Sequence, residues 1–243
     1  MTLKKYYNYI LSLVIMLLLG ATAYAQESDM EQPDFNAIKK EVNDPHSPYY
    51  YPTLIQKYNS NDTTMTDDEF RYYYLGYTFQ EDYNPYRTSE FAHQIDHLYK
   101  QNKKLSVAEY ENLVKFAKQT LDDDPFDLRQ INILIHGLKG LKRYRDAAVW
   151  QYRLDHLIDA IISTGDGTTP ETAWHVIYPN HEYIILNCLG MKGVDFVFVE
   201  PYYDYVEIEK NTRRIEGFYF NVKRILDVYA QKYCYEEGTE IEK

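Results

Sequence analysis

Three Asp-Pro or Asn-Pro dipeptides lie 40 residues apart in the sequence, and the same pattern of apolar positions follows each of them. They are Asp44-Pro45, Asn84-Pro85 and Asp124-Pro125. Behind each proline come two triplets of apolar residues spaced by four and then three positions, which is typical of one face of a helix. In the three copies the triplets begin at Tyr51, Phe91 and Ile131, and at Phe70, Tyr110 and Trp150. The period predicts a unit of two helices that is repeated three times.

Helix-capping residues recur in register with these triplets. Thr66 with Glu69 and Ser106 with Glu109 form capping-box patterns 40 residues apart, and Asp127 is placed to cap a helix behind the third proline. We therefore expect paired helices at residues 49–59 and 66–80, 88–101 and 106–123, and 127–141 and 144–163. An irregular helical bundle is the alternative, because a chain with 45% hydrophobic residues matches some apolar columns by chance.

The paired helices resemble tetratricopeptide-type hairpins, although the usual period of those repeats is shorter. Ala147 and Ala148 give only a trace of their small-residue pattern. The resemblance implies stacked helices with a concave groove that takes a peptide or protein partner. We therefore expect a partner of that class.

The helical spacing ends at Gly165. Thr168 and Glu171 are placed to cap one short turn around Pro170. Beyond this turn, the pattern predicts a strand at 174–178, a short helix at 182–189, strands of an antiparallel meander at 194–199, 202–208 and 215–222, and a closing helix. The predicted fold is α+β but mainly α, with helical hairpins over residues 44–164 and a small β-containing domain over residues 165–243.

The chain begins with a pattern typical of a secretory signal peptide. Lys4 and Lys5 precede the apolar residues 10–19, and Ala23-Tyr24-Ala25 places small residues at the third and first positions before a cleavage point. We expect cleavage after Ala25, followed by a lead-in segment over residues 26–43 whose first part, 26–33, is disordered. An uncleaved membrane anchor is the alternative. The pattern predicts an exported protein, periplasmic or extracellular.

The sequence is acidic, with a net charge of −11 that becomes −13 once the two lysines of the signal segment are removed. Phosphate groups repel such a chain, which argues against nucleic-acid and anionic-membrane partners. No second apolar segment is long enough to cross a bilayer, so no stable membrane span is expected after cleavage. The sequence has no phosphate-binding glycine loop and no nucleophile elbow, and we expect no cofactor and no metal.

Two residue types leave alternatives open. Cys188 and Cys234 are the only cysteines, and export permits a disulfide between them, whereas the alternative is two buried thiols. The 27 tyrosines are the second case. Most of them recur at helical spacing and are expected in the core, but a ring with a polar edge also suits the stacking of sugars.

Four ionisable residues gather in the sequence where the helical spacing ends. They are Asp166, Glu171, His175 and His181. Carboxylates beside imidazoles support acid–base chemistry or bind a cation, so these four form the candidate binding set, with no catalytic residue assigned. Asp166 and Glu171 are also expected to serve as turn and capping residues.

A separate pair, His93 and His97, lies four residues apart on a predicted helix. A metalloprotease motif needs glutamate directly after the first histidine, and Gln94 occupies that position. The pair also points away from the apolar stripe of its helix. We therefore expect a solvent-facing pair rather than a metal site.

The last third of the chain carries a family resemblance. Its motif residues are Asp166-Gly167-Thr168-Thr169-Pro170-Glu171-Thr172-Ala173, Glu182-Tyr183 with Leu186, Leu189 and Gly190, and Tyr219-Phe220-Asn221-Val222. They resemble a family of unknown function in exported proteins of Gram-negative bacteria, and the likeness extends over most of the chain behind the signal segment. The resemblance implies export and architecture, and it carries no activity. Trp174-His175 and the run of tyrosines depart from the family pattern.

These features favour an exported, non-catalytic binding or scaffolding protein. The repeat, the signal peptide and the lack of a coherent catalytic set all lead to this hypothesis. One alternative is a hydrolase of glycans or peptides with its site within residues 166–181. Another is a surface sugar-binding module that uses tyrosines such as Tyr202 and Tyr203.

Overall fold

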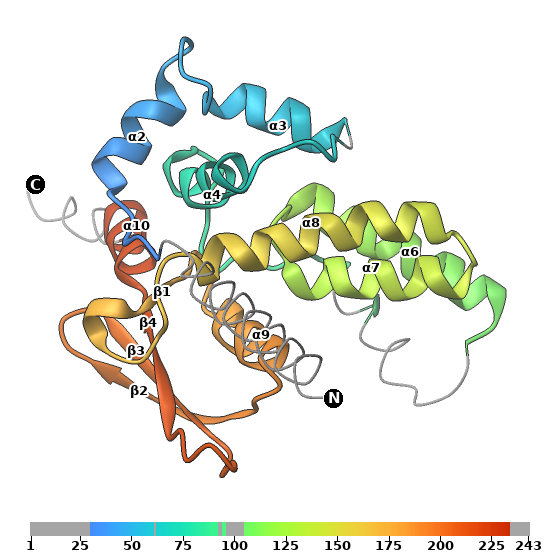
Figure 1. Ribbon diagram of the computed structural model, residues 1–243. Helices are drawn as coiled ribbons and strands as arrows, with labels where there is room; N and C mark the ends of the chain where they lie inside the picture. The colour runs from blue at the N-terminus through green and yellow to red at the C-terminus, as the bar shows by residue number, and fades with distance from the viewer. Residues whose placement is uncertain (1–29, 61, 92–93, 96–104, 234–243) are drawn as a thin grey trace, which may run out of the picture.

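A computed structural model describes residues 30–60, 62–91, 94–95 and 105–233 of the protein (Figure 1). Within these residues, eight α-helices are combined with one four-stranded sheet that lies toward the C-terminal end of the chain. The fold is α+β and mainly α, as the sequence predicts.

The first helices of the described chain form a small layer of their own. They are α2 (Phe35–Asn43), α3 (Tyr51–Asn59) and α4 (Asp67–Gly76), and α4 is prolonged by the short helix η1 (Tyr77–Phe79). Helices α3 and α4 match the first predicted pair. Helix α2 falls in the predicted lead-in segment and was not expected there. Asp34 caps it, and its buried Ile38 and Val42 form the apolar face of a helix that packs on α4.

The segment before α2 is also more ordered than the sequence suggests. Of residues 26–33, the structure describes 30–33, and they lie against the end of the helical region. The amide of Glu31 donates to the carbonyl of Ser163 at 3.0 Å. Gln32 Oε1 lies 2.7 Å from His175 Nε2. The prediction of an unstructured lead-in is therefore wrong for these residues, because polar side chains that look solvent-exposed in sequence bind backbone and side chains far along the chain.

Three longer helices follow: α6 (Val107–Asp123), α7 (Leu128–Gly140) and α8 (Tyr144–Ile162). Both predicted capping boxes are present, at the starts of α4 and α6, and Asp127 caps α7. The predicted helix at 88–101 is only partly visible. Residues 88–89 are irregular and 90–91 form a turn, whereas 94–95 are helical, and most of the remainder lies outside the described residues.

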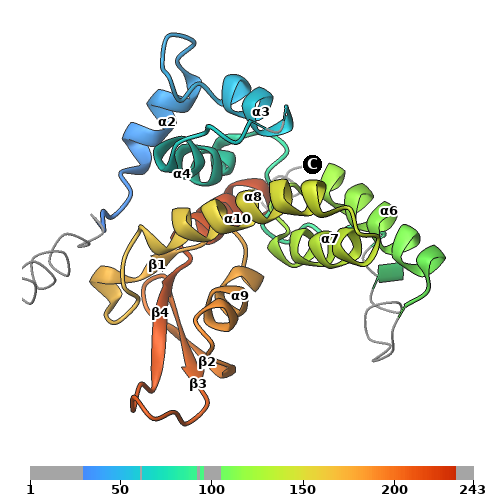
Figure 2. The same ribbon diagram turned by 45° about the vertical axis from the view of Figure 1, so that its right-hand side comes forward.

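Helix α8 is the element that joins the parts of the molecule. It packs on α7, which packs on α6, and its second half packs on α4. In both views α2, α3 and α4 lie on one side of α8, and the sheet with α9 lies on the other (Figures 1 and 2). Tyr152 donates its hydroxyl to the carbonyl of Met65 at 2.8 Å, and Arg71 donates to Ser163 Oγ at 2.6 Å. The first hairpin is thereby attached to the second helix of the third predicted pair.

The sheet has the strand order β1-β4-β3-β2. Its strands are β1 (Trp174–His175), β2 (Gly193–Val199), β3 (Tyr203–Ile208) and β4 (Gly217–Asn221), and the helices beside it are α9 (Asn180–Cys188) and α10 (Lys223–Tyr233). Strands β2, β3 and β4 form the predicted antiparallel meander. Strand β1 adds a parallel pair with β4, which makes the sheet mixed. It is shorter than predicted, because Val176, Ile177 and Tyr178 leave the sheet and enter the core.

One hydrophobic core runs through the helices and the sheet. Tyr74 of α4, Phe126 before α7 and Phe220 of β4 are all fully buried in it. The Tyr83 hydroxyl donates to the carbonyl of Ile177 at 2.6 Å. Seven tyrosines belong to this core: Tyr51, Tyr58, Tyr73, Tyr74, Tyr77, Tyr83 and Tyr178. Their hydroxyls give the core a polar interior, and each buried ring contributes about 1.5–3 kcal/mol of hydrophobic stabilisation.

We find no helix among the described residues with the length and apolar character needed to cross a membrane.

Candidate ligand-binding site

Asp166 and Glu171 lie in the turn that leads from α8 to β1. Asp166 Oδ1 accepts hydrogen bonds from the Thr172 hydroxyl at 2.5 Å and the Thr168 amide at 2.9 Å. These bonds, that from Thr172 first, lower the pKa of Asp166. The short helix η2 (Pro170–Thr172) is capped by Thr169. The predicted cap by Thr168 and Glu171 is wrong by one position, because the Thr168 hydroxyl donates to Asp166, and Glu171 is exposed.

The same turn is closed by a glycine and a tryptophan. Gly167 has a φ of 69°, and a Cβ atom there would lie 2.7 Å from Trp174 Cε3. Trp174 Nε1 donates to the carbonyl of Gly165 at 2.8 Å. A larger residue at position 167 would meet both the unfavourable φ and the indole ring. This part of the sequence motif therefore shapes a turn.

His175 and His181 are buried in separate places. His181 Nδ1 lies 2.7 Å from the Tyr74 hydroxyl, and its Nε2 lies 2.9 Å from the Phe126 carbonyl. Because a carbonyl only accepts, Nε2 carries the proton and Nδ1 accepts from Tyr74. Burial lowers the pKa of His181 to about 4, and burial followed by the charge of Arg71 lowers the pKa of His175 to about 4. Both imidazoles are neutral near pH 7.

The four residues of the candidate set thus have different partners and do not form one constellation. Asp166 binds its own turn, Glu171 is exposed, His175 binds Gln32, and His181 binds α4 and the start of α7. His93, His97 and Cys234 lie outside the described residues. Cys188 is exposed at the end of α9. The disulfide between the two cysteines remains a prediction.

A different site lies where α3, α6 and α8 meet. A cavity of about 420 Å³ opens there, and a second cavity of about 260 Å³ continues from it toward η1. Four residues line both cavities: Asn59, Leu121, Asp122 and Pro125. We call the two together the hairpin groove. Its combined volume falls in the range of ligand-binding clefts.

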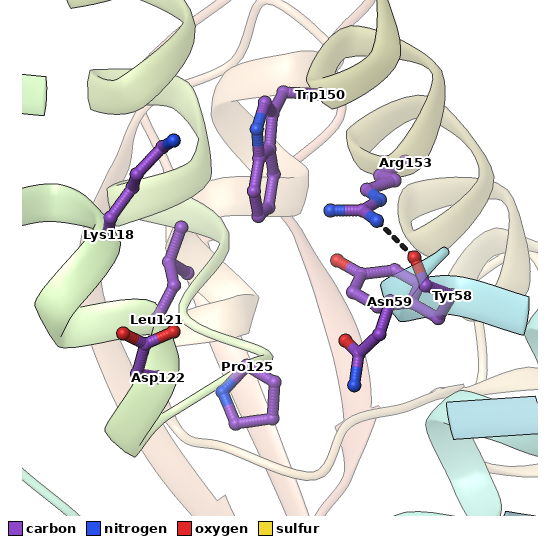
Figure 3. A pocket seen from close by; sticks show the side chains of 8 residues that line it. All are labelled: Tyr58, Asn59, Lys118, Leu121, Asp122, Pro125, Trp150 and Arg153. Carbon is purple, nitrogen blue, oxygen red and sulfur yellow. Dashed lines mark hydrogen bonds between the residues drawn. The ribbon is translucent and has the colours of Figure 1, made fainter. Parts of the chain in front are cut away.

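The groove has one wall on α6 and another on α3 and α8. In Figure 3, Lys118, Leu121 and Asp122 face Tyr58, Asn59 and Arg153 across the first cavity, with Trp150 and Pro125 between the two walls. Lys118 and Asp122 are exposed and lie one helical turn apart.

Arg153 is held by aromatic rings at the head of the groove. Its guanidinium carbon lies 4.2 Å from the centre of the Tyr58 ring and 4.4 Å from that of Trp150. One of its nitrogens donates to the backbone carbonyl of Tyr58 (Figure 3). Burial lowers the pKa of Arg153, but a guanidinium stays charged at any physiological pH. The two cation–π contacts and the hydrogen bond fix both the charge and its direction.

Tyr58 places a buried hydroxyl beside this charge. The hydroxyl has no hydrogen-bond partner among the described residues, and it points toward the space between the walls (Figure 3). Burial raises the pKa of Tyr58 to about 12, although the charge of Arg153 acts in the opposite direction. A buried hydroxyl without a partner costs about 1–3 kcal/mol, so this group would gain from any polar group that reached it.

The far end of the groove is acidic. Asp82 lines the second cavity and accepts a hydrogen bond from the Tyr77 hydroxyl at 3.1 Å. The groove therefore carries positive charge at Arg153 and Lys118, negative charge at Asp82, and Asp122 between them.

The family comparison covers all of these elements. The matching family model extends over residues 36–231, from the start of α2 to the end of α10. The chain belongs to the family described as domain of unknown function (DUF4919). The DUF4919 region includes every residue that lines the hairpin groove. Neither the curated proteins nor the solved structures contain a match to the chain.

Sequence reasoning located the groove of the DUF4919 region only in general terms. A stack of hairpins implies a concave surface, but Tyr58 and Trp150 look like core positions of the repeat. Arg153 stands among apolar neighbours on the same helix and gives the one local signal, because a charge at a semi-buried helical position needs a partner. Trp150 is on the same helix, but the contact with Tyr58 of α3 depends on the packing of α8 against the first hairpin.

Proposed function

We propose that the protein is an exported, non-catalytic binding protein that holds a segment of a peptide or protein partner in the hairpin groove. The observation that carries this proposal is the groove itself, in which a fixed cation, acidic groups and a hydroxyl without a partner among the described residues surround two adjoining cavities. Polypeptide segments offer both charges and a regular series of backbone donors and acceptors, which fits such a mixed lining.

The aromatic rings of the groove favour a peptide over a sugar. Sugar binding by stacking needs a ring face that is open to the ligand. The faces of Tyr58 and Trp150 are directed at Arg153, and Tyr51 stacks on Tyr73 and Tyr77 at 5.6 and 6.5 Å. Each of these rings therefore has a face occupied by another side chain, and shape and polar contacts would select the ligand.

The placement of the ionisable residues supports binding rather than catalysis. General acid–base chemistry needs groups that can reach the same reacting atoms. Asp166 and His181, two members of the candidate set, use their polar atoms for a turn and for the core. A hydrolase screen that finds turnover abolished by His175→Gln would revive the alternative of an enzyme.

The export part of the proposal rests on the N-terminal sequence. We expect the chain, expressed in a Gram-negative host, to be recovered from the periplasm or medium with Gln26 as its first residue. Intact-mass spectrometry of the purified protein measures this directly. Retention of Met1 would contradict cleavage after Ala25.

The binding part is tested by filling the groove. Asn59 is exposed and lines both cavities, so Asn59→Trp places a large ring where they join. The matched control is Gln56→Trp, an exposed position on the same helix outside the linings of both cavities. We expect an array of random peptides to bind wild type and the control, and to lose at least about tenfold in affinity with Asn59→Trp.

Equal binding by the three proteins would place the ligand elsewhere and overturn the proposal. Binding to a glycan array that is lost only with Asn59→Trp would keep the groove as the site but replace the peptide with a sugar. Urea unfolding of each variant shows whether a loss of binding reflects a loss of folding.

A further inference from the structure

Strand β2 leaves a set of large apolar side chains exposed at the edge of the sheet. Val194, Phe196, Val197 and Phe198 have exposed fractions of 44–54%. On one side β2 pairs with β3, and in the strand order its other side has no neighbour. Tyr183 of the adjacent α9 and Leu189 directly after that helix are also exposed. Six of the large apolar residues that the described chain exposes are therefore on β2 and on α9 with its C-cap.

An edge of this kind is unusual in a protein that stays monomeric. Native sheets protect their edges with charged residues, proline, short strands or bulges. Strand β2 has seven residues, no proline and one charged side chain, Asp195. A register shift between Gly193 and Asp195 distorts the start of the strand, but the pairing from Asp195 to Val199 is regular. The Phe196 amide donates to Asp195 Oδ1 at 2.8 Å, an exposed contact that a further strand would replace, and the rest of the edge is open.

The charges at the two ends of β2 indicate which strand would fit. Lys192 directly precedes the strand, and Glu200 directly follows it. When two copies of the same strand pair in antiparallel fashion, the start of each lies beside the end of the other. Lys192 of each copy then meets Glu200 of the other copy, whereas parallel pairing would bring like charges together.

We propose that β2 pairs with β2 of a second copy of this chain, antiparallel and centred near Phe196, to form one continuous eight-stranded sheet. In this register Phe196 lies across from its own equivalent, and Val194 lies across from Phe198. Asp195 lies across from Val197, so the two aspartates do not oppose each other. The two-fold symmetric contact uses the same patch on both copies, as closed dimers require.

The existing partner of Lys192 does not prevent this contact. Its Nζ lies 2.5 Å from Glu209 Oε1, but the two side chains are 70% and 54% exposed. An exposed ion pair of this kind contributes about 0–1 kcal/mol, so the lysine can turn to a second carboxylate at little cost. Glu200 makes no ion pair within the described residues.

The test is a charge exchange measured by sedimentation of the full exported chain over a roughly hundredfold range of concentration. We expect wild type to show a monomer–dimer equilibrium. Lys192→Glu and Glu200→Lys should each weaken the dimer by about tenfold, because every dimer holds two such contacts. The double variant Lys192→Glu with Glu200→Lys should restore dimerisation. The control is Lys210→Glu, a charge reversal at the exposed residue that follows Glu209 in the chain, and it should leave the dimer affinity unchanged.

Two results would overturn the proposal. A wild-type chain that remains monomeric throughout rules out a second copy as the occupant of this edge. A dimer that the single reversals leave intact, or that the double exchange does not restore, has another interface. Circular dichroism of each variant confirms that the monomer stays folded, and Val197→Lys, which places a charge in the middle of the strand, should abolish the dimer in the same measurement.

Discussion

At the scale of single residues, two buried tyrosines differ in how their hydroxyls are bonded. Tyr74 and Tyr58 are both nearly inaccessible to solvent. The Tyr74 hydroxyl accepts a hydrogen bond from the Ile177 amide at 3.1 Å and donates one to His181 Nδ1 at 2.7 Å, so it is satisfied both as acceptor and as donor. The Tyr58 hydroxyl has no such partner among the described residues. One hydroxyl is bonded within the core, and the other has no hydrogen bond among the described residues.

This contrast gives a prediction about folding stability. Tyr58→Phe should leave the free energy of unfolding unchanged or raise it by up to about 1 kcal/mol, because no hydrogen bond is lost. Tyr74→Phe should lower it by about 1–3 kcal/mol, because the Ile177 amide and a ring nitrogen of His181 lose their partner in the core. Urea unfolding of the two variants beside wild type is the measurement.

The same volume of side chain is removed in both variants, so each serves as the control for the other. Equal destabilisation would mean that Tyr58 has a structural partner after all, and that its hydroxyl plays no special part in the groove.

At the scale of elements, the sequence predicts those whose signals are local. Helices α6 and α7 begin at the expected caps, because a capping residue and the apolar stripe behind it act within a few residues. The meander strands likewise follow from runs of branched and aromatic residues.

The elements that were missed depend on distant contacts. Helix α2 has a capping Asp34 but only nine residues, and a helix this short is stable mainly through its packing on α4. Strand β1 is two residues long because His175 and its neighbours are bound by groups far along the chain. The candidate site shows the same limit. The groove lies where α3, α6 and α8 meet, and no local sequence pattern predicts that α3 and α8 come together.

At the scale of the whole molecule, His181 lies where the helical region and the sheet region share their core. It comes from α9 and bonds to Tyr74 of α4 and to the Phe126 carbonyl before α7. The neutral ring fits this place because one nitrogen donates while the other accepts. A second proton would replace the acceptor with a donor directed at the Tyr74 hydroxyl, whose own proton now points to the ring.

Acid should therefore destabilise the core that the helical region and the sheet region share. The pKa of His181 is about 4 in the fold and close to 6.5 in an unfolded chain, so its contribution is complete above pH 6.5 and is lost as the pH falls toward 4. Up to about 3 kcal/mol is at stake. His181→Gln should be less stable than wild type at pH 7.5, and this difference should shrink at pH 5. His46→Gln, at an exposed histidine, is the control for removing an imidazole.

The comparison must be made between variants at each pH. Burial, followed by the charge of Asp127, raises the pKa of Asp124 to about 7. Protonation of this carboxyl therefore increases the free energy of unfolding as the pH falls from 7 toward 4. In wild type this increase partly cancels the loss of stability caused by His181. Urea midpoints measured in parallel separate the two. A gap between His181→Gln and wild type that stays constant from pH 7.5 to 5 would contradict the proposed role of the proton.

The contact between Gln32 and His175 joins positions 143 residues apart, which sets an order on the events of folding. The N-terminal segment cannot take its final place until the ribosome has completed, and any export machinery has passed, most of the chain. Helix α2 packs on α4 and has no such dependence, so residues 30–33 can be anchored later than the helix that follows them. The N-terminal segment is thus joined to the fold at two places that are synthesised at very different times.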